Sequence, residues 1–272
     1  MSLKDRIPGP LRPAAKALRN AALWPADVVA RRQDPLFPPR RLRGLVGDGD
    51  YHAAAEEFRA HFVDLGGLGR AARVLDVGCG TGRMAARLTR YLEPPGTYHG
   101  IDVMVPAIEW AQREISSRYA NFQFQVADLQ SDMYNPGGAI RAEDYRFPYA
   151  DDSFDFIFLT SVFTHLTAAE IRNYLAECRR LLAAGGACFA TWFISDQPDG
   201  DPARAHRSFP FPVDEYFVER EDNHRAAVAY RQRTLDELYA EQGFDTTIHP
   251  GFWNGRRGAA PSYQDIVVAR HR

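Results

Sequence analysis

The 272-residue sequence has little of what marks membrane or nucleic-acid-binding proteins. No apolar run is long enough to span a bilayer, and the N-terminus lacks the continuous apolar segment of a signal peptide. The formal net charge is −2, whereas nucleic-acid binding normally needs a clear basic excess. We therefore expect a cytoplasmic protein with no nucleic-acid partner and no stable membrane insertion.

Cysteine is also scarce, and the spacing of the three cysteines matches neither a metal site nor a redox pair. We expect Cys79, Cys178 and Cys188 to be small buried thiols in a reducing compartment. Asp151 and Asp152 could contribute to a metal site, but they also suit an exposed turn before a strand. We prefer the turn, so the sequence predicts no metal site; Mg²⁺ is compatible with the sequence but not indicated by it.

Two catalytic signatures are absent from the sequence. It contains no G-x-S-x-G motif and no G-x-x-x-x-G-K-[ST] motif. Hydrolase and nucleoside-triphosphatase functions are therefore without their usual sequence support.

The most informative stretch is residues 74–83, VLDVGCGTGR. An apolar run with β propensity ends in a carboxylate, three glycines alternate with other residues, and a helical pattern follows. A buried strand that leads into a helix through a glycine loop is where an α/β sheet binds a nucleotide-like ligand. Glycine lets the backbone approach the ligand where a Cβ atom would collide. Arg83 stands where a dinucleotide-binding loop has its third glycine.

Strand and helix patterns alternate along the chain. Capping boxes at Thr167/Glu170 and Thr234/Glu237 should begin two of the helices. The first of these should end at Gly185 and Gly186. Predicted strands lie at residues 74–77, 98–101, 122–126, 154–162, 187–194, 245–249 and 263–269, and predicted helices at 51–65, 83–91, 106–119, 167–185 and 234–243.

This alternation predicts an α/β fold with a doubly wound, Rossmann-like, seven-stranded sheet. The last two strands are joined without a helix, so they should form an antiparallel C-terminal pair. Three aspartates, Asp76, Asp102 and Asp128, end three successive strands and should line one crevice. Asp102 lies 20 residues beyond Gly82, the distance at which an acid meets a ribose in this architecture. Each aspartate could instead be a cap or turn residue.

The glycine loop and the terminal strand pair resemble those of class I S-adenosylmethionine-dependent methyltransferases. The resemblance covers about residues 73–194 and the C-terminal strands. Residues 161–166 (SVFTHL) and 262–268 (SYQDIVV) further resemble bacterial methyltransferases that modify small molecules and saccharides. The D/N-P-P-Y/F motif of members that methylate nucleic-acid bases or protein glutamine is absent after the fourth strand.

The resemblance implies a role for each matching residue. Asp76 would place the ammonium group of the cofactor, and Asp102 would hold its ribose. Val103 and Met104 would form an apolar wall for adenine, although Met104 could equally be ordinary core. The full set implied to bind S-adenosylmethionine is Asp76, Gly78, Gly80, Gly82, Asp102, Val103, Met104, Asp128 and Leu129.

His165 is the candidate catalytic residue. It follows the fourth strand, where this family passes beside the sulfonium and faces the acceptor. An imidazole is the usual base for removing a proton from a hydroxyl near neutral pH. The alternative is a histidine that caps or packs against the next helix.

The first 45 residues differ from the rest because they are basic and rich in proline. This arm, with a short amphipathic helix predicted at residues 13–23, could touch an anionic membrane surface or cover a substrate site. We favour an arm that packs on its own domain or on a second subunit of a homo-oligomer. The methyltransferase domain would span residues 46–272, with inserts at about 129–150 and 196–233.

The sequence as a whole predicts an enzyme that converts S-adenosylmethionine to S-adenosylhomocysteine. We expect O-methylation of a hydroxyl on a small polar acceptor, with a sugar or glycan as the first hypothesis. One alternative is N- or C-methylation of a small molecule. Others are an NAD-dependent oxidoreductase, which would use the same Asp102, and a cofactor-binding module without catalysis.

Overall fold

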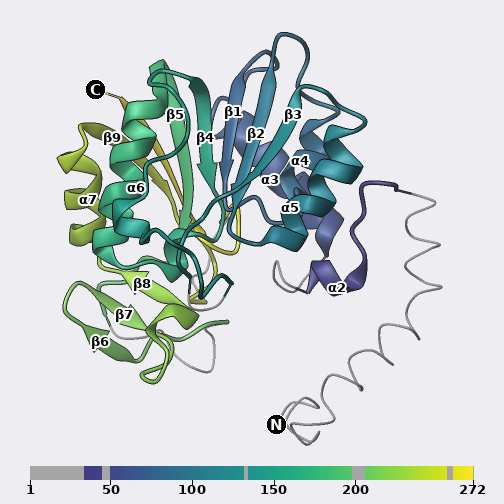
Figure 1. The fold of residues 1–272 in the computed structure, drawn as a ribbon. Coiled ribbons are helices and arrows are strands. Elements are labelled where there is room, and N and C mark those ends of the chain that lie inside the picture. The colour runs from purple at the N-terminus through teal and green to yellow at the C-terminus, as the bar shows by residue number, and fades with distance from the viewer. Residues whose placement is uncertain (1–33, 45–49, 132–133, 198–205, 256–259, 272) are drawn as a thin grey trace, which may run out of the picture.

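The computed structural model describes residues 34–44, 50–131, 134–197, 206–255 and 260–271 (Figure 1). The helix predicted at residues 13–23 lies outside these ranges. A seven-stranded sheet crosses the molecule with the strand order β3-β2-β1-β4-β5-β10-β9. Its strands are β1 (Arg73–Val77), β2 (Thr97–Asp102), β3 (Phe122–Val126), β4 (Phe154–Leu159), β5 (Leu182–Trp192), β9 (Phe244–His249) and β10 (Asp265–His271).

The pairing of the strands confirms the predicted fold class. The first five strands pair in parallel, and β10 pairs antiparallel with both β5 and β9. The central strand β4 is apolar at almost every position because helices cover the sheet on both faces. The strand order reverses between β1 and β4, so the carboxyl ends of these two strands form a topological switch point.

Helices pack on both faces of the sheet (Figure 1). One core lies between the sheet and α3 to α5, and the other lies between the sheet and α6 with α7. The α5 helix continues into a π-helical turn, η3. These elements are α3 (Tyr51–Asp64), α4 (Arg83–Leu88), α5 (Val105–Ala111), η3 (Gln112–Ser116), α6 (Ala168–Leu181) and α7 (Gln232–Glu241).

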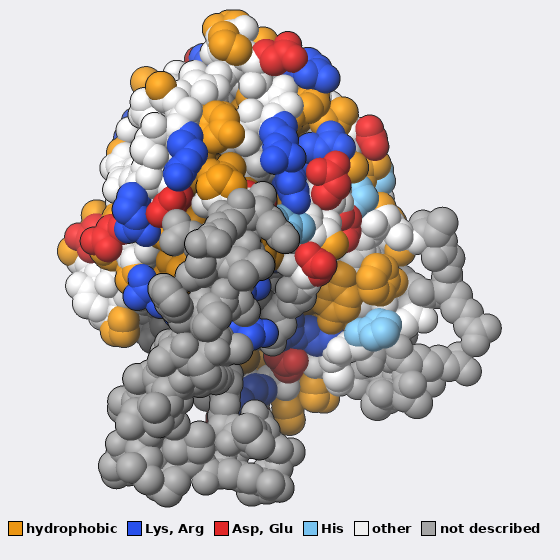
Figure 2. Space-filling model, turned by 90° about the vertical axis from the view of Figure 1, so that its right-hand side faces the viewer, with side chains coloured by type: hydrophobic (Ala, Val, Ile, Leu, Met, Phe, Trp, Pro, Cys, Tyr) orange, Lys and Arg blue, Asp and Glu red, His pale blue; other side chains and the backbone are white. Residues whose placement is uncertain are grey.

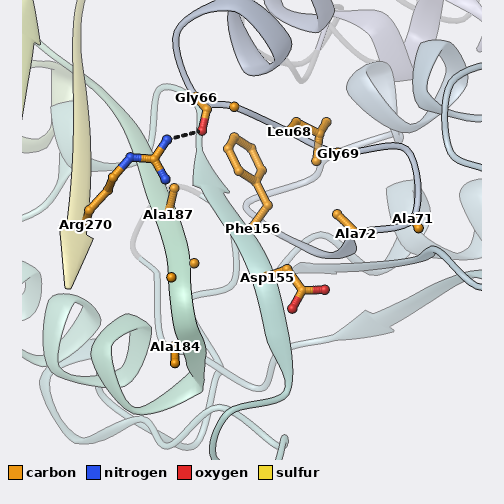
Figure 3. Close-up of a pocket in the computed structure, with 13 residues that line it drawn as sticks. Gly66, Leu68, Gly69, Ala71, Ala72, Asp155, Phe156, Ala184, Ala187 and Arg270 are labelled. Carbon is orange, nitrogen blue, oxygen red and sulfur yellow. Dashed lines mark hydrogen bonds between the residues drawn. The ribbon is translucent and has the colours of Figure 1, made fainter.

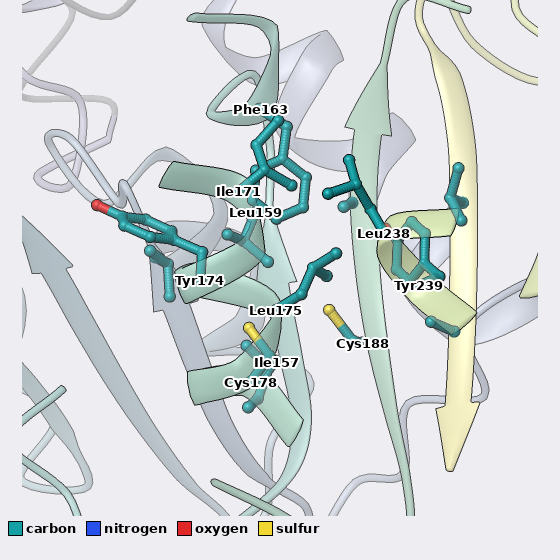
Figure 4. Close-up of a cluster of buried hydrophobic side chains, with 14 of the residues drawn as sticks. Ile157, Leu159, Phe163, Ile171, Tyr174, Leu175, Cys178, Cys188, Leu238 and Tyr239 are labelled. Atoms are coloured by element: carbon teal, nitrogen blue, oxygen red, sulfur yellow. The ribbon is translucent and has the colours of Figure 1, made fainter. Parts of the chain in front are cut away.

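The core under α6 shows how these layers hold together (Figure 4). Ile171 lies beside Leu159 of β4, and Leu175 lies near Ile157 of the same strand; all four side chains are fully buried. Burial of each such side chain contributes about 1.5–3 kcal/mol. Cys178 and Cys188 belong to the same core, and both are buried, free thiols as predicted. The third cysteine, in the glycine loop, is also buried and free.

Two predicted helix boundaries are wrong. The α6 helix ends at Leu181, and β5 begins at Leu182, so Gly185 and Gly186 lie within the strand. Gly185 has a φ of 78°, and the pairing of β4 with β5 shifts register here, which makes the glycines part of a bulge rather than a helix stop. The fourth strand is also shorter than predicted and ends at Leu159.

The second wrong boundary is the start of α7. The helix begins at Gln232, two residues before the predicted cap, and Asp196 accepts a hydrogen bond from the backbone N–H of Gln232 at 3.0 Å. Thr234 donates instead to the carbonyl oxygen of Glu215. A distant aspartate therefore replaces the expected local capping box. The box at Thr167 and Glu170 forms as predicted.

A small antiparallel sheet occupies part of the 196–233 insert, where no regular element is predicted. Its strands are β6 (Phe211–Val213), β7 (Tyr216–Val218) and β8 (Val228–Tyr230), and a short 3₁₀ turn, η6 (His224–Ala226), precedes β8. A bridge between Ile194 and Tyr230 fixes this sheet to the chain that leaves β5. The small sheet therefore lies at the carboxyl end of the main sheet (Figure 1).

The described part of the N-terminal arm packs on its own domain. Leu36 and Leu42 are buried in the core that α3 and α4 share, and Leu42 lies on the short helix α2 (Arg40–Arg43). Phe37 stacks on the ring of His52 at 4.6 Å, which joins the arm to α3. The proposed boundary near residue 46 stays a prediction.

The surface of the described chain carries charges of both signs. On the face shown in Figure 2, acidic and basic side chains are interspersed, which is typical of a solvated surface. Within the described ranges, none of the helices combines the length and the apolar composition that a membrane crossing requires. The cytoplasmic location stays a prediction.

Candidate cofactor and acceptor site

The glycine loop joins β1 to α4 at the switch point of the sheet. Gly78, Gly80 and Gly82 have φ values of 80°, 54° and 74°, which other residues rarely adopt. A Cβ atom at Gly78 would lie 2.5 Å from a methyl group of Val162, and one at Gly82 would lie 2.6 Å from Ile115. Backbone conformation and close packing therefore both require glycine in this loop.

Asp102 braces the loop from the end of β2. One carboxylate oxygen accepts from the N–H of Gly80 at 2.7 Å, and the other accepts from the N–H of Met104 at 2.9 Å. Burial raises the pKa of Asp102, although these backbone hydrogen bonds act in the opposite direction. Each oxygen retains a second lone pair, so the carboxylate can still accept hydrogen bonds from ribose hydroxyls.

Asp76 lies beneath the loop and is almost completely buried, with 1% of its surface exposed. Its Oδ2 accepts from the hydroxyl of Tyr98, whereas Oδ1 has no hydrogen-bond donor among the described residues. Burial raises the pKa of Asp76, and the nearby charge of Asp102 raises it further. A buried acceptor without a donor costs about 1–3 kcal/mol, so this oxygen fits the ammonium group of an amino-acid ligand.

The remaining residues of the predicted cofactor site follow β2 and β3. Val103 and Met104 are half-buried, and Met104 caps α5. Asp128 is exposed and accepts from the N–H of Ala139 at 3.2 Å, while Leu129 is buried. Because β1, β2 and β3 are neighbours in the sheet, the structure brings Asp76, Asp102 and Asp128 to adjacent strand ends. Their roles toward a ligand stay predictions.

Two tyrosines lie beside this crevice, and sequence reasoning gave the first of them no role in the site. Tyr51, at the start of α3, forms a 3.2 Å hydroxyl–hydroxyl hydrogen bond with Thr81 of the loop, and the guanidinium of Arg83 lies 5.3 Å from the Tyr51 ring centroid. Tyr134 is 42% exposed, and after burial the charge of Asp102 is what raises its pKa. Both contacts join segments far apart in sequence, so no local sequence pattern predicts them.

His165 lies in a 3₁₀ turn, η5 (Phe163–His165), just after β4. Its Nδ1 is 3.0 Å from the carbonyl oxygen of Arg225, so Nδ1 carries the proton that it donates, and Nε2 is the basic nitrogen. Burial lowers the pKa of His165, which keeps the ring neutral near pH 7. Thr167, not His165, caps the following helix. The geometry thus suits a base.

The turn that leads to His165 carries local strain. Ser161 has a φ of 58°, a left-handed conformation that costs about 1–3 kcal/mol in a residue other than glycine. Its backbone N–H donates to the hydroxyl of Thr191 at 2.7 Å, which stabilises the turn. The chain therefore leaves β4 sharply, at the carboxyl end where the glycine loop also lies.

Asp151 and Asp152 lie in an exposed turn before β4, as predicted. Asp151 pairs with Arg180 at 2.7 Å, so this carboxylate has a partner within the protein.

A pocket of about 350 Å³ lies at the end of the sheet opposite to the glycine loop (Figure 3). Asp155 and Arg270 are the charged residues in its lining, and both have partners. Arg270 donates to the carbonyl oxygen of Gly66 at 2.8 Å, and Asp155 pairs with Arg73 at 2.7 Å. Because the pocket lies at the amino ends of β4 and β5, it is separate from the crevice at the carboxyl ends.

Comparison with known proteins identifies the kind of domain that holds this crevice. Residues 74–186, from β1 into β5, match a family model described as a methyltransferase domain. This segment is therefore a methyltransferase domain. The glycine loop, Asp76, Asp102, Asp128 and His165 all lie inside the matched segment. This result favours S-adenosylmethionine over NAD as the cofactor of the domain.

Three relatives show what this methyltransferase domain is similar to. The chain is 25% identical over 268 residues to the polyketide synthase ThaQ of Burkholderia thailandensis, with 92% of this chain and 12% of ThaQ covered. It is 30% identical over 129 residues to a demethylmenaquinone methyltransferase of Roseiflexus sp., with 47% and 46% covered. The chain thus spans less than half the length of either relative.

The third relative is a solved structure. The 1,6-didemethyltoxoflavin-N1-methyltransferase of Burkholderia thailandensis, crystallised with S-adenosylhomocysteine, superposes with a TM-score of 0.51 at 19% sequence identity. The alignment covers 93% of this chain and 89% of that one. At this identity the likeness shows a shared fold.

Proposed function

We propose that this protein transfers a methyl group from S-adenosylmethionine to a hydroxyl of a small polar acceptor and forms S-adenosylhomocysteine. The observation that carries the proposal is the crevice at the switch point. There, the glycine loop is braced by Asp102 and lies above a buried carboxylate oxygen of Asp76 that has no donor among the described residues. A ligand that combines an ammonium group with a ribose would satisfy both carboxylates.

Each part of the crevice would hold one part of the cofactor. Asp76 would accept from the ammonium group, and the backbone of the glycine loop would border the methionine part. Asp102 would accept from the ribose hydroxyls. The adenine contacts would come from Val103, Met104, Asp128 and Leu129. When bound, S-adenosylmethionine supplies an electrophilic methyl group on its sulfonium.

His165 would act as the general base. An aliphatic hydroxyl is a weak nucleophile until its proton begins to leave, and a neutral imidazole can take that proton. The Arg225 carbonyl holds Nδ1 and orients the ring, so Nε2 is the nitrogen available for the acceptor. The depressed pKa of His165 keeps this base unprotonated over the physiological range.

The acceptor we favour is a sugar or a glycan end. A small-molecule acceptor is supported by the names of the relatives, one of which acts on a demethylmenaquinone and another on a didemethyltoxoflavin nitrogen. The second candidate is N- or C-methylation of a small molecule, and the name of the toxoflavin enzyme, an N1-methyltransferase, favours a nitrogen. A neutral amine nitrogen has a lone pair that can attack the methyl group directly, so N-methylation would depend less on His165.

Isothermal titration calorimetry tests the cofactor. We expect purified protein to bind S-adenosylhomocysteine and to give no heat with NAD under the same conditions. Binding of NAD, or no binding of S-adenosylhomocysteine, would refute the proposed function. Tight binding without methyl transfer to any small-molecule acceptor would identify a non-catalytic binding module.

A further inference from the structure

An ion pair between Arg207, which precedes β6, and Glu219, which directly follows β7, lies near His165. Two nitrogens of Arg207 donate to the two carboxylate oxygens of Glu219, each at 3.0 Å, and each side chain is 30% exposed. The guanidinium of Arg207 also lies over the ring of Phe193, 5.4 Å from its centroid, in a cation–π contact. This geometry fixes both groups while leaving part of each open to a ligand.

Backbone contacts connect this pair to the proposed base. The backbone N–H of Glu219 donates to the carbonyl oxygen of Ala227 at 3.1 Å, two residues beyond the Arg225 carbonyl that holds His165. The charge of Arg207 lowers the pKa of His165, and the charge of Glu219 raises it. Both charges are therefore close enough to act on the imidazole.

An aromatic face borders the ion pair. The ring of Tyr263 lies 5.6 Å from the ring of Phe252 and 6.3 Å from the ring of His206, measured between centroids. Phe252 is 40% exposed, so part of its ring is open to a ligand. The charges of Arg207 and Glu219 also shift the pKa of Tyr263 in opposite directions, after burial as the main cause.

Buried hydrogen bonds hold the aromatic face in place. Asp265, which is fully buried, accepts from the indole of Trp253 at 2.7 Å and from the N–H of Gly251 at 2.7 Å. The carbonyl oxygen of Trp253 accepts from the backbone N–H groups of His206 at 2.8 Å and Arg207 at 3.2 Å. The aromatic residues and the ion pair are therefore parts of one rigid arrangement.

The same segment reaches the end of β4. Gln264, next to Tyr263, accepts from the hydroxyl of Ser161 at 3.0 Å. Ser161 belongs to the turn that leads to His165, so the aromatic face and the base are joined from this side as well.

We propose that Arg207, Glu219, Phe252 and Tyr263 form the acceptor subsite beside His165, and that they select a saccharide-like ring with neighbouring hydroxyls. This inference rests on the proposed function and specifies its substrate class. Arginine can only donate hydrogen bonds and an ionised glutamate can only accept them, whereas a hydroxyl does both. Two adjacent hydroxyls therefore match the pair, and the C–H face of the ring can pack on the aromatic side chains.

The alternative acceptor chemistry fits this subsite poorly. A quinone ring presents only acceptor oxygens, which would match the remaining donors of Arg207 but would give no hydrogen bond to the remaining lone pairs of Glu219. The Arg207–Glu219 pair carries no net charge, so it does not attract an anionic acceptor either. A neutral polyhydroxylated ring satisfies all of these features together.

Saturation-transfer NMR on the full chain loaded with S-adenosylhomocysteine tests the subsite. The probes are the methyl glycosides of glucose, mannose and rhamnose, with menadione as the contrasting ring. We expect at least one glycoside to bind, and Glu219→Gln and Tyr263→Ala each to weaken it about tenfold. Arg220→Gln is the matched control, because Arg220 forms an exposed ion pair with Asp222 in the same region.

The possible outcomes distinguish a failure of the proposed subsite from a failure of the proposed function. Calorimetry with S-adenosylhomocysteine on the same samples shows whether the proposed function holds. If the cofactor product binds but menadione is preferred, or if Glu219→Gln and Tyr263→Ala bind the glycoside as the wild type does, the subsite is wrong and the function stands. If the cofactor product does not bind, both ideas fail. Should Tyr263→Ala not fold, Glu219→Gln decides, because it preserves size and shape.

Discussion

Replacing Asp102 by alanine should weaken cofactor binding through a direct contact. The carboxylate would accept charge-assisted hydrogen bonds from the ribose hydroxyls, and their loss is worth about 1.5–3 kcal/mol. That range corresponds to a dissociation constant for S-adenosylhomocysteine raised roughly 10- to 150-fold. The measurement is isothermal titration calorimetry. Asp236→Ala is the matched control, because this exposed aspartate of α7 lies outside the crevice and carries the same charge.

The structure adds a second consequence that must be separated from the first. Asp102 also accepts from the backbone of Gly80 and Met104, so its removal should loosen the glycine loop and lower the melting temperature. An S-adenosylhomocysteine analogue without ribose hydroxyls distinguishes the two effects. Asp102→Ala should cost this analogue much less affinity than it costs the natural product, because the direct contact is already missing. Wild-type affinity in Asp102→Ala would remove Asp102 from the site, and equal losses for both ligands would restrict it to bracing the loop.

Two further predictions concern the base and the loop. In His165→Asn, the side-chain amide can still donate to the Arg225 carbonyl but cannot take a proton, so kcat with the true acceptor should fall about 10²–10⁴-fold with cofactor affinity unchanged. In the wild type, activity should fall as the pH drops through the pKa of His165, and burial places that midpoint below the ordinary histidine value of about 6.5. A normal kcat in His165→Asn, or a midpoint above 6.5, would contradict this role. Gly82→Ala should destabilise the protein by about 1–3 kcal/mol in urea unfolding, because φ is 74° and the new Cβ would meet Ile115 at 2.6 Å. Unchanged stability would show that the loop relaxes freely.

Local sequence signals were sufficient to predict the order of the main strands and helices and the fold class. Apolar runs of strand length, glycine in the β1–α4 turn and the Thr167/Glu170 box act within a few residues, so their structural meaning does not depend on distant partners. Parallel pairing then places successive strand ends side by side. This is why Asp76, Asp102 and Asp128 could be assigned to one crevice from their positions in the sequence alone.

Non-local pairing explains the elements that were predicted wrongly or not at all. Gly185 and Gly186 have the composition of a helix stop, but pairing with β4 draws them into a strand. The small sheet formed by β6, β7 and β8 has strands of three residues each, too short to show a periodicity. Its strands are stable because they pair with one another and pack at the end of β5.

The fold class, the glycine loop, the strand-end carboxylates and the position of His165 after β4 all follow from local sequence. The groups that those residues contact depend on the tertiary structure. Only the folded chain shows that Asp102 braces Gly80, that a buried oxygen of Asp76 receives no hydrogen bond from the described residues, and that the Arg225 carbonyl selects the tautomer of His165. The same holds for the Arg207–Glu219 pair beside Tyr263. Hydrogen bonding and burial depend on distances between remote segments, and no local pattern encodes those distances.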